Sequence, residues 1–123
     1  MYFYNEDHQS QFEELVSLNQ QGGQQNEKIA SLYVAALLPA RVLADFKQQE
    51  YIIYEDLVAL TDETNPKGKR LSTGEKQLIR LAYVLFHGDD RLDVQLSNYL
   101  GYGYEYKEAV VQALQLHYGI ATV

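Results

Sequence analysis

The chain contains no cysteine, and this absence excludes several kinds of site at once. Without thiols it can form no disulfide, no thiolate metal site and no cysteine nucleophile. Tryptophan is also missing, whereas tyrosine occurs eleven times among the 123 residues. The lack of disulfides is compatible with a reducing compartment.

Long apolar runs are absent as well. The longest one, around Val34–Pro39, is far shorter than the ~20 residues that span a bilayer. The first residues, Met1–Asp7, lack the basic region and the apolar stretch of a secretion signal. We therefore expect a cytoplasmic protein that makes no contact with a membrane.

Positive charge is scarce. Ten Lys and Arg residues stand against 17 Asp and Glu residues, so the formal net charge is −7. Proteins that bind nucleic acid usually present a basic face, and the overall sign argues against such a partner. Three interpretations of the acidic surface stay open: simple solvation, a basic protein partner, or mimicry of nucleic acid by a phage-type inhibitor.

The remaining composition is that of an ordinary globular domain, with 46% hydrophobic and 22% charged residues. The length fits a single domain over residues 1–123. Apolar residues recur at helical spacing along most of the chain. We expect an all-α bundle of about five or six helices.

The first half of the chain contains three of these expected helices. Asn5 is a good N-cap for the first, and the residues Gln20–Gln25 end it. A second helix starts at Asn26 and is apolar on nearly every side, which predicts a buried central helix. Pro39 either kinks this helix or opens a third one at its first position.

The second half begins with Tyr51–Tyr54, the only run that resembles a strand. It has no evident pairing partner, so it either crosses the bundle or leads into a short helix over 55–60. Further helices are predicted over 72–88 and 105–118, with a shorter segment between them. Gly119 is placed to stop the last helix.

The segment Leu71–Ala82, which reads LSTGEKQLIRLA, resembles the signature segment of ATP-binding-cassette ATPases. In that family an LSGG-type turn opens a helix that meets a nucleotide phosphate, so the resemblance implies an anion site at a helix start. The resemblance ends there. The chain has no GxxxxGK[ST] phosphate loop, and Arg91–Val94 lacks an apolar run ending in paired acids. We therefore expect no ATPase.

A structural interpretation also explains this segment. Ser72 as N-cap and Glu75 three residues later form a capping box, with Leu71 positioned as a hydrophobic staple. The competing interpretation is an anion- or nucleotide-binding site, for which the candidate residues are Lys69, Arg70, Ser72, Thr73, Gly74 and Lys76.

A basic patch keeps the anion-binding hypothesis open. Half of the ten basic residues fall within 14 positions: Lys67, Lys69, Arg70, Lys76 and Arg80. The alternative is that Asp62 and Glu63, just upstream, neutralise the patch as surface ion pairs.

A tyrosine cluster is the other candidate surface, formed by Tyr99, Tyr102, Tyr104 and Tyr106. Tyrosine is common at protein interfaces because it is large and apolar with a polar tip. The cluster therefore predicts either a protein or dimer contact, or packing at the margin of the core.

No residue pattern predicts catalysis or a cofactor. His87 lies near Asp89, Asp90 and Asp93, but the spacing fails that of an EF-hand, and no HExxH motif is present. No Gly-x-Ser-x-Gly elbow occurs. We expect no metal, no cofactor and no catalytic residue.

The Leu71–Gly88 stretch resembles small uncharacterised helical proteins of Gram-positive bacteria and their phages, through its LSxGE start, leucine-rich helix and glycine end. That resemblance implies a bacterial cytoplasmic protein and no particular activity. The leading hypothesis is a non-enzymatic protein-interaction module that binds either a protein partner or a second copy of itself. Binding of a small anion is the second hypothesis, and the acidic inhibitor is the third.

Overall fold

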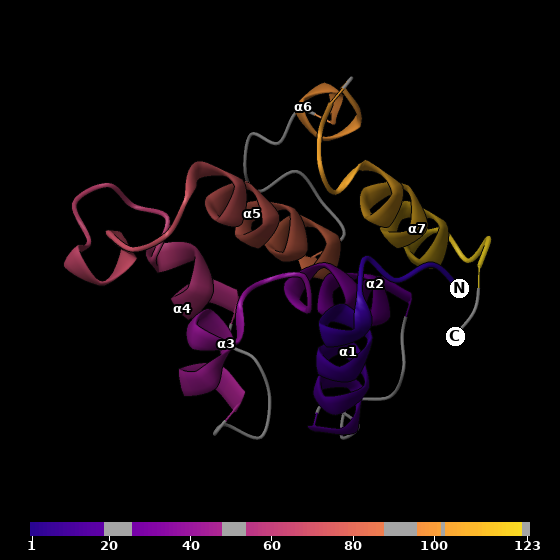
Figure 1. Cartoon of the computed structure of the whole chain (residues 1–123), viewed down its shortest axis with the longest axis horizontal. Coiled ribbons are helices and arrows are strands. Elements are labelled where there is room, and N and C mark those ends of the chain that lie inside the picture. Colours follow the sequence, from indigo (N-terminus) through magenta and orange to yellow (C-terminus); the bar gives the residue numbers. More distant parts are fainter. Residues whose placement is uncertain (19–25, 48–53, 88–95, 102, 122–123) are drawn as a thin grey trace.

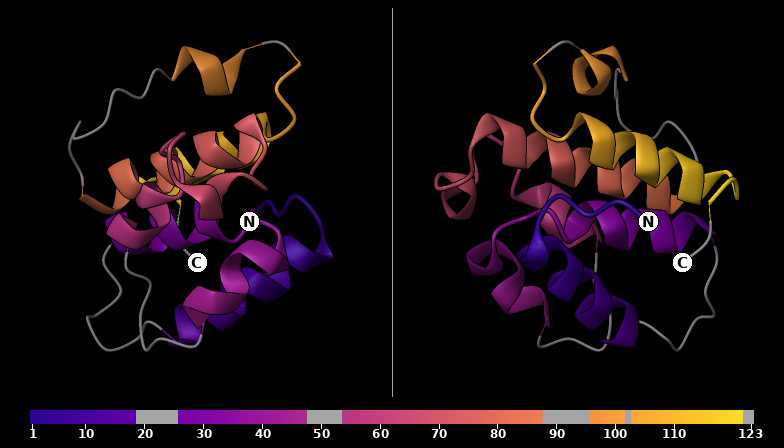
Figure 2. Two further views of the ribbon diagram at one scale, coloured as in Figure 1. Left: turned by 90° about the vertical axis from the view of Figure 1, so that its left-hand side faces the viewer. Right: turned by 45° about the vertical axis from the view of Figure 1, so that its right-hand side comes forward.

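Helix α2 (Asn26–Ala35) is the central element of the fold. Every residue from Ile29 to Leu38 is buried. Helices α5 (Thr73–His87) and α7 (Lys107–His117) pack on one side of α2, and α1 (Glu6–Leu18) packs on the other (Figures 1 and 2). A helix that is apolar on all sides must be surrounded, and the prediction of a buried central helix is confirmed.

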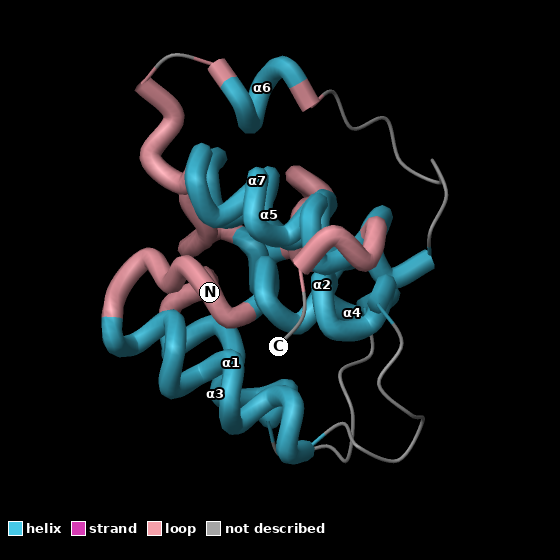
Figure 3. Tube along the Cα trace, turned by 90° about the vertical axis from the view of Figure 1, so that its right-hand side faces the viewer, coloured by secondary structure: helices cyan, strands magenta, loops and turns pink. Residues whose placement is uncertain are grey.

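The computed structural model describes residues 1–18, 26–47, 54–87, 96–101 and 103–121. The remaining elements in this part are α3 (Ala40–Lys47), α4 (Tyr54–Ala59), the 3₁₀ turn η2 (Pro66–Gly68) and α6 (Ser97–Leu100). The described residues contain no strand, which confirms the all-α prediction (Figure 3). They contain seven α-helices rather than five or six, because the short α4 and α6 are separate helices.

Helix α1 begins where the sequence predicted. The Oδ1 atom of Asn5 accepts a hydrogen bond from the His8 N–H at 2.8 Å, and Glu6 and Asp7 occupy the first turn. Negative charge there is favoured by the helix dipole. Phe12 and Leu15 then point into the core.

Pro39 separates α2 from α3. Its carbonyl accepts a hydrogen bond from the Leu43 N–H at 3.3 Å, so it stands directly before the first residue of α3 and does not kink α2. The Gln11 side chain of α1 closes the end of α2, where Nε2 donates to the carbonyls of Ala36 and Leu38 at 2.8 and 2.9 Å. These carbonyls would otherwise lack a helical partner.

Helix α7 ends at a glycine, as predicted. Gly119 has a φ of 74°, a conformation that glycine adopts at little cost. The N–H of Ile120 donates to the Gln115 carbonyl at 2.8 Å, and that of Gly119 donates to the Leu116 carbonyl at 3.2 Å. This pair of bonds is the Schellman motif, which satisfies the last carbonyls of the helix.

Most of the strand-like run lies outside the described residues. Tyr51–Ile53 lies outside, while Tyr54 begins the short helix α4 that was one of the alternatives. Among the described helices, none has the length and apolar character needed to cross a bilayer.

Candidate anion-binding site

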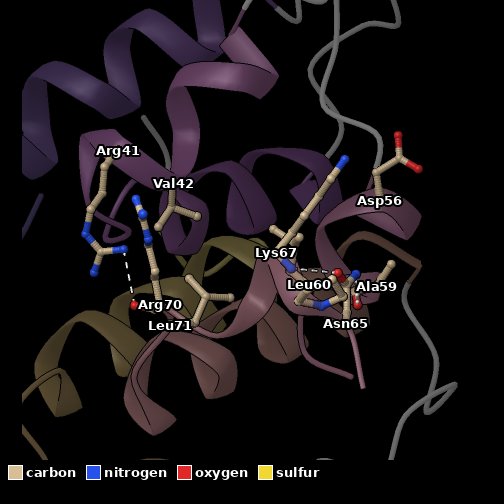
Figure 4. A pocket seen from close by; sticks show the side chains of 10 residues that line it. Arg41, Val42, Asp56, Ala59, Leu60, Asn65, Lys67, Arg70 and Leu71 are labelled. Carbon is tan, nitrogen blue, oxygen red and sulfur yellow. Dashed lines mark hydrogen bonds between the residues drawn. The ribbon is translucent and has the colours of Figure 1, made fainter. Parts of the chain in front are cut away.

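A cavity of about 900 Å³ lies where α3, α4 and η2 meet the start of α5 (Figure 4). Val42, Leu60 and Leu71 contribute apolar side chains to the lining (Figure 4). The lining residues are Arg41, Val42, Asp56, Ala59, Leu60, Asn65, Pro66, Lys67, Arg70 and Leu71.

The start of α5 is a capping box, as the sequence predicted. The Ser72 N–H donates to Glu75 Oε1 at 2.9 Å, and the Glu75 N–H donates to Ser72 Oγ at 3.1 Å. Each side chain thus satisfies a backbone donor of the other residue. Leu71 packs against the core. A hydrophobic staple would also need an apolar fourth residue in the helix, but that residue is Lys76, so the predicted staple does not form.

Arg41 of α3 holds the same carboxylate. Its Nη2 atom lies 2.9 Å from both Glu75 oxygens, and its Nη1 atom donates to the Arg70 carbonyl at 3.4 Å. Glu75 is only 9% exposed, so burial makes this neutralisation important. Arg41 therefore ties α3 to the loop before α5 and to α5 itself.

The loop that carries the basic patch is held tightly against the end of α4. The Asn65 side chain donates to the Ala59 carbonyl at 2.9 Å and accepts from the Lys67 N–H at 3.0 Å. Gly68 lies so close to α4 that a Cβ atom there would stand 1.9 Å from the Leu60 carbonyl oxygen. The backbone that carries Lys67 and Arg70 is consequently fixed.

Lys67 and Arg70 have no carboxylate at ion-pair distance within the described part of the chain. The expectation that Asp62 and Glu63 neutralise the patch is not met there. Asp62 accepts instead from the N–H and Oγ1 of Thr64, at 2.9 and 2.8 Å. These hydrogen bonds hold the pKa of the Asp62 carboxyl below its usual value.

Only one of the predicted anion-binding residues, Arg70, lines the cavity. The lining does not include Lys69, Ser72, Thr73, Gly74 or Lys76. The Ser72 hydroxyl is engaged by the capping box. Sequence reasoning missed Arg41, because it lies 34 positions before Glu75 and no local pattern joins the two.

The tyrosine cluster is packed into the fold. Tyr99 is 3% exposed, and its hydroxyl donates to the Gln77 carbonyl of α5 at 2.6 Å. The half-buried Tyr104 contacts the rings of Tyr99 and Tyr106 edge-on, at centroid distances of 5.7 and 5.9 Å. Tyr102 lies outside the described residues. Tyr99 thus serves the core, and an interface role of Tyr104 and Tyr106 stays a prediction.

Among the residues that the structure describes, no three His, Asp or Glu side chains are grouped so as to hold a metal ion. His87 lies near Glu55 of α4, with its Nε2 atom 3.2 Å from Oε1. The aspartates considered with His87, at 89, 90 and 93, fall outside the described ranges.

Comparison of the chain with protein-family models, with curated proteins and with solved structures found no match in any of the three. The function of the cavity is therefore argued from its own residues.

Proposed function

We propose that this protein binds an anionic ligand in the cavity between α3, α4 and the start of α5. The observation that carries the proposal is the pair Lys67 and Arg70. Both line the cavity, and no carboxylate of the described residues lies at ion-pair distance from either. In a chain of net charge −7 these two cations stay unpaired among the described residues, and Asp56, the acidic residue of the lining, lies beyond ion-pair distance of both.

The chemistry of the lining supports this role. The guanidinium of Arg70 offers several donors in a plane, which suits phosphate and carboxylate groups. Lys67 adds a point charge on a flexible stem. Val42, Leu60 and Leu71 supply apolar surface beside these charges, as is usual in small-molecule sites. The cavity therefore suits a ligand with an anionic group and an apolar part.

Thermal unfolding tests the proposal, with inorganic phosphate, polyphosphate, citrate, GTP and MgATP as probes. A ligand at about 100 times its Kd stabilises the folded state by about 2.7 kcal/mol. For a domain of this length, that corresponds to a rise of roughly 10 °C in Tm. We expect such a rise with at least one probe.

The matched variants separate the cavity from the rest of the basic patch. The double variant Lys67→Ala, Arg70→Ala is expected to lose the rise in Tm. The control double variant Lys69→Ala, Lys76→Ala removes the same charge from residues that do not line the cavity, and it is expected to keep most of the rise. Equal losses in both variants, or no rise with any probe, would contradict the proposal.

Self-association is a second candidate function, favoured by an apolar patch on α7. Val111 is an exposed residue of α7, Tyr118 is its C-cap residue seven positions later, and Ile120 follows after Gly119. Tyr118 and Ile120 are 71% and 76% exposed, the largest exposed fractions among the large apolar side chains of the described residues. Sedimentation velocity over a wide concentration range is the test. A concentration-dependent dimer that Tyr118→Ser, Ile120→Ser abolishes would support it, and a monomer throughout would reject it.

A further inference from the structure

The N-terminal segment, Met1–Asn5, is docked across the molecule from α1 to α7 (Figure 1). The Tyr2 N–H donates to Gln112 Oε1 of α7 at 2.9 Å, and the Tyr2 carbonyl accepts from the Tyr33 hydroxyl at 2.5 Å. Phe3 packs into an aromatic cluster with His8, Phe12 and Tyr33, with ring centroids 5.4 to 6.0 Å away.

His8 makes the third polar attachment of this segment. The imidazole is 2% exposed, and both of its nitrogens are engaged. Nδ1 accepts from the Tyr4 N–H at 3.0 Å, and Nε2 lies 2.8 Å from the Tyr33 carbonyl oxygen. A backbone N–H can only donate and a carbonyl can only accept, so the partners require a neutral ring with its proton on Nε2.

Protonation of His8 is incompatible with this arrangement. A second proton on Nδ1 would face the Tyr4 N–H, so the hydrogen bond that holds the segment would be replaced by two opposed donors. The groups that contact the ring are Phe3 and Tyr4 from the segment and Tyr33 from α2, and Phe12 of α1 packs on Phe3 and Tyr33 in turn. None of them is a carboxylate, and Glu6 and Asp7 of the first turn are exposed.

Burial consequently lowers the pKa of His8 below its usual 6.5, against the smaller opposing effect of the Tyr33 carbonyl. This lowered pKa makes the stability of the docked segment depend on pH. As the pH falls below 6.5, the free imidazole gains a proton before the docked one does, so docking loses stability between 6.5 and the lowered pKa.

We propose that His8 is a pH-sensitive latch, whose protonation releases the N-terminal segment from α1, α2 and α7 while the helices stay folded. Release would uncover the Tyr33 hydroxyl and the apolar rings of the cluster. The latch lies apart from the cavity and is independent of the function proposed for it.

Nuclear Overhauser effects (NOEs) between the rings of Phe3 and Tyr33 in the full chain test the latch. We expect these NOEs at pH 7.5 and their loss as the pH is lowered, at a pH where NOEs between α2 and α5 still persist. Loss of the α2–α5 contacts at the same pH would show global unfolding instead of release, and would overturn the proposal. Persistence of the Phe3–Tyr33 NOEs down to the pH at which the α2–α5 NOEs disappear would overturn it as well.

Two variants and one spectroscopic measurement test whether His8 itself causes the release. The variant His8→Gln cannot gain a proton and is expected to lose the pH response, whereas His117→Gln, which removes a half-buried imidazole of α7, is expected to keep it. If His8→Gln fails to fold, the ¹⁵N shifts of the His8 ring in the unaltered protein answer the question. A ring that is not in the Nε2–H form at pH 7.5, or that stays neutral after the Phe3–Tyr33 NOEs are lost, would overturn the latch.

Discussion

Buried polar groups have partners in the aromatic cluster around His8, whereas the cations in the cavity beside α5 have no carboxylate partner among the described residues. In the cluster, both imidazole nitrogens and the Tyr33 hydroxyl have hydrogen-bond partners, and the surrounding rings exclude water. In the cavity, Lys67 and Arg70 face open space, with no carboxylate of the described residues at ion-pair distance. A satisfied buried group stabilises the fold, whereas an unpaired charge facing a hollow remains available to a ligand.

The largest expected change in the free energy of unfolding comes from removing a buried ring of the aromatic cluster. Phe12→Ala removes a buried ring that packs on Phe3 and Tyr33, and it should lower the free energy of unfolding by about 3–5 kcal/mol. Arg70→Ala should change it by less than about 0.5 kcal/mol, because the side chain is exposed. Urea unfolding measures both. Similar losses in the two variants would remove the distinction between the regions.

Gly68→Ala is expected to have the next largest effect, in the loop between Lys67 and Arg70. The added Cβ would meet the Leu60 carbonyl oxygen, which is backbone and cannot rotate away. Overpacking of this kind costs about 1–3 kcal/mol. Gly74→Ala, where the nearest atom to a Cβ is 3.9 Å away, is the matched control and should be almost neutral. A neutral Gly68→Ala would show that the loop is not held against α4.

Ser72→Ala should have a smaller effect, of about 1 kcal/mol, because it removes the side-chain half of the capping box. Thr73→Ala, one position inside the helix, is the control. Thermal unfolding gives both values. If Ser72 bound an anion instead of capping α5, Ser72→Ala would lower ligand affinity and leave the stability of the free protein unchanged.

The last expected effect appears only at high pH. Burial raises the pKa of Tyr99 and of Tyr104 to about 12. The unfolded chain loses these protons near pH 10, so stability should fall as the pH rises from 10 to 12. Phenolate absorbance should show several tyrosines that titrate late, and Tyr99→Phe should reduce that late absorbance change by one tyrosine. Titration of every tyrosine near pH 10 would place Tyr99 outside the packed core.

Local signals predicted several features correctly. Asn5, Asn26 and the Ser72–Glu75 pair mark helix starts, and Gly119 marks a helix end. Each signal acts through hydrogen bonds within a few residues, so no knowledge of the packing is needed to read it. The apolar character of 29–38 likewise predicted a buried central helix, since its residues are apolar on all sides.

The candidate site was predicted only in part. The basic patch was visible in the sequence, but of the six residues chosen for an anion site only Arg70 lines the cavity. The choice followed the helix start, whereas Glu75 and Ser72 accept hydrogen bonds from each other's N–H groups there, and Arg41 pairs with the Glu75 carboxylate. The tyrosine cluster was predicted as a spacing pattern, and the packing of Tyr99 against α5 could not be inferred from it.

The sequence by itself determined the helical class, the caps and the central position of α2, because these depend on composition, periodicity and contacts within one turn. Only the tertiary structure decided which charges are paired. Arg41 pairs with Glu75, 34 positions away in the sequence, and Gln11 donates to the Ala36 carbonyl after α2, 25 positions away. Such pairs depend on how helices pack, and the packing is set by the burial of the whole apolar surface at once. The same packing left Lys67 and Arg70 around a cavity and enclosed His8 among aromatic rings.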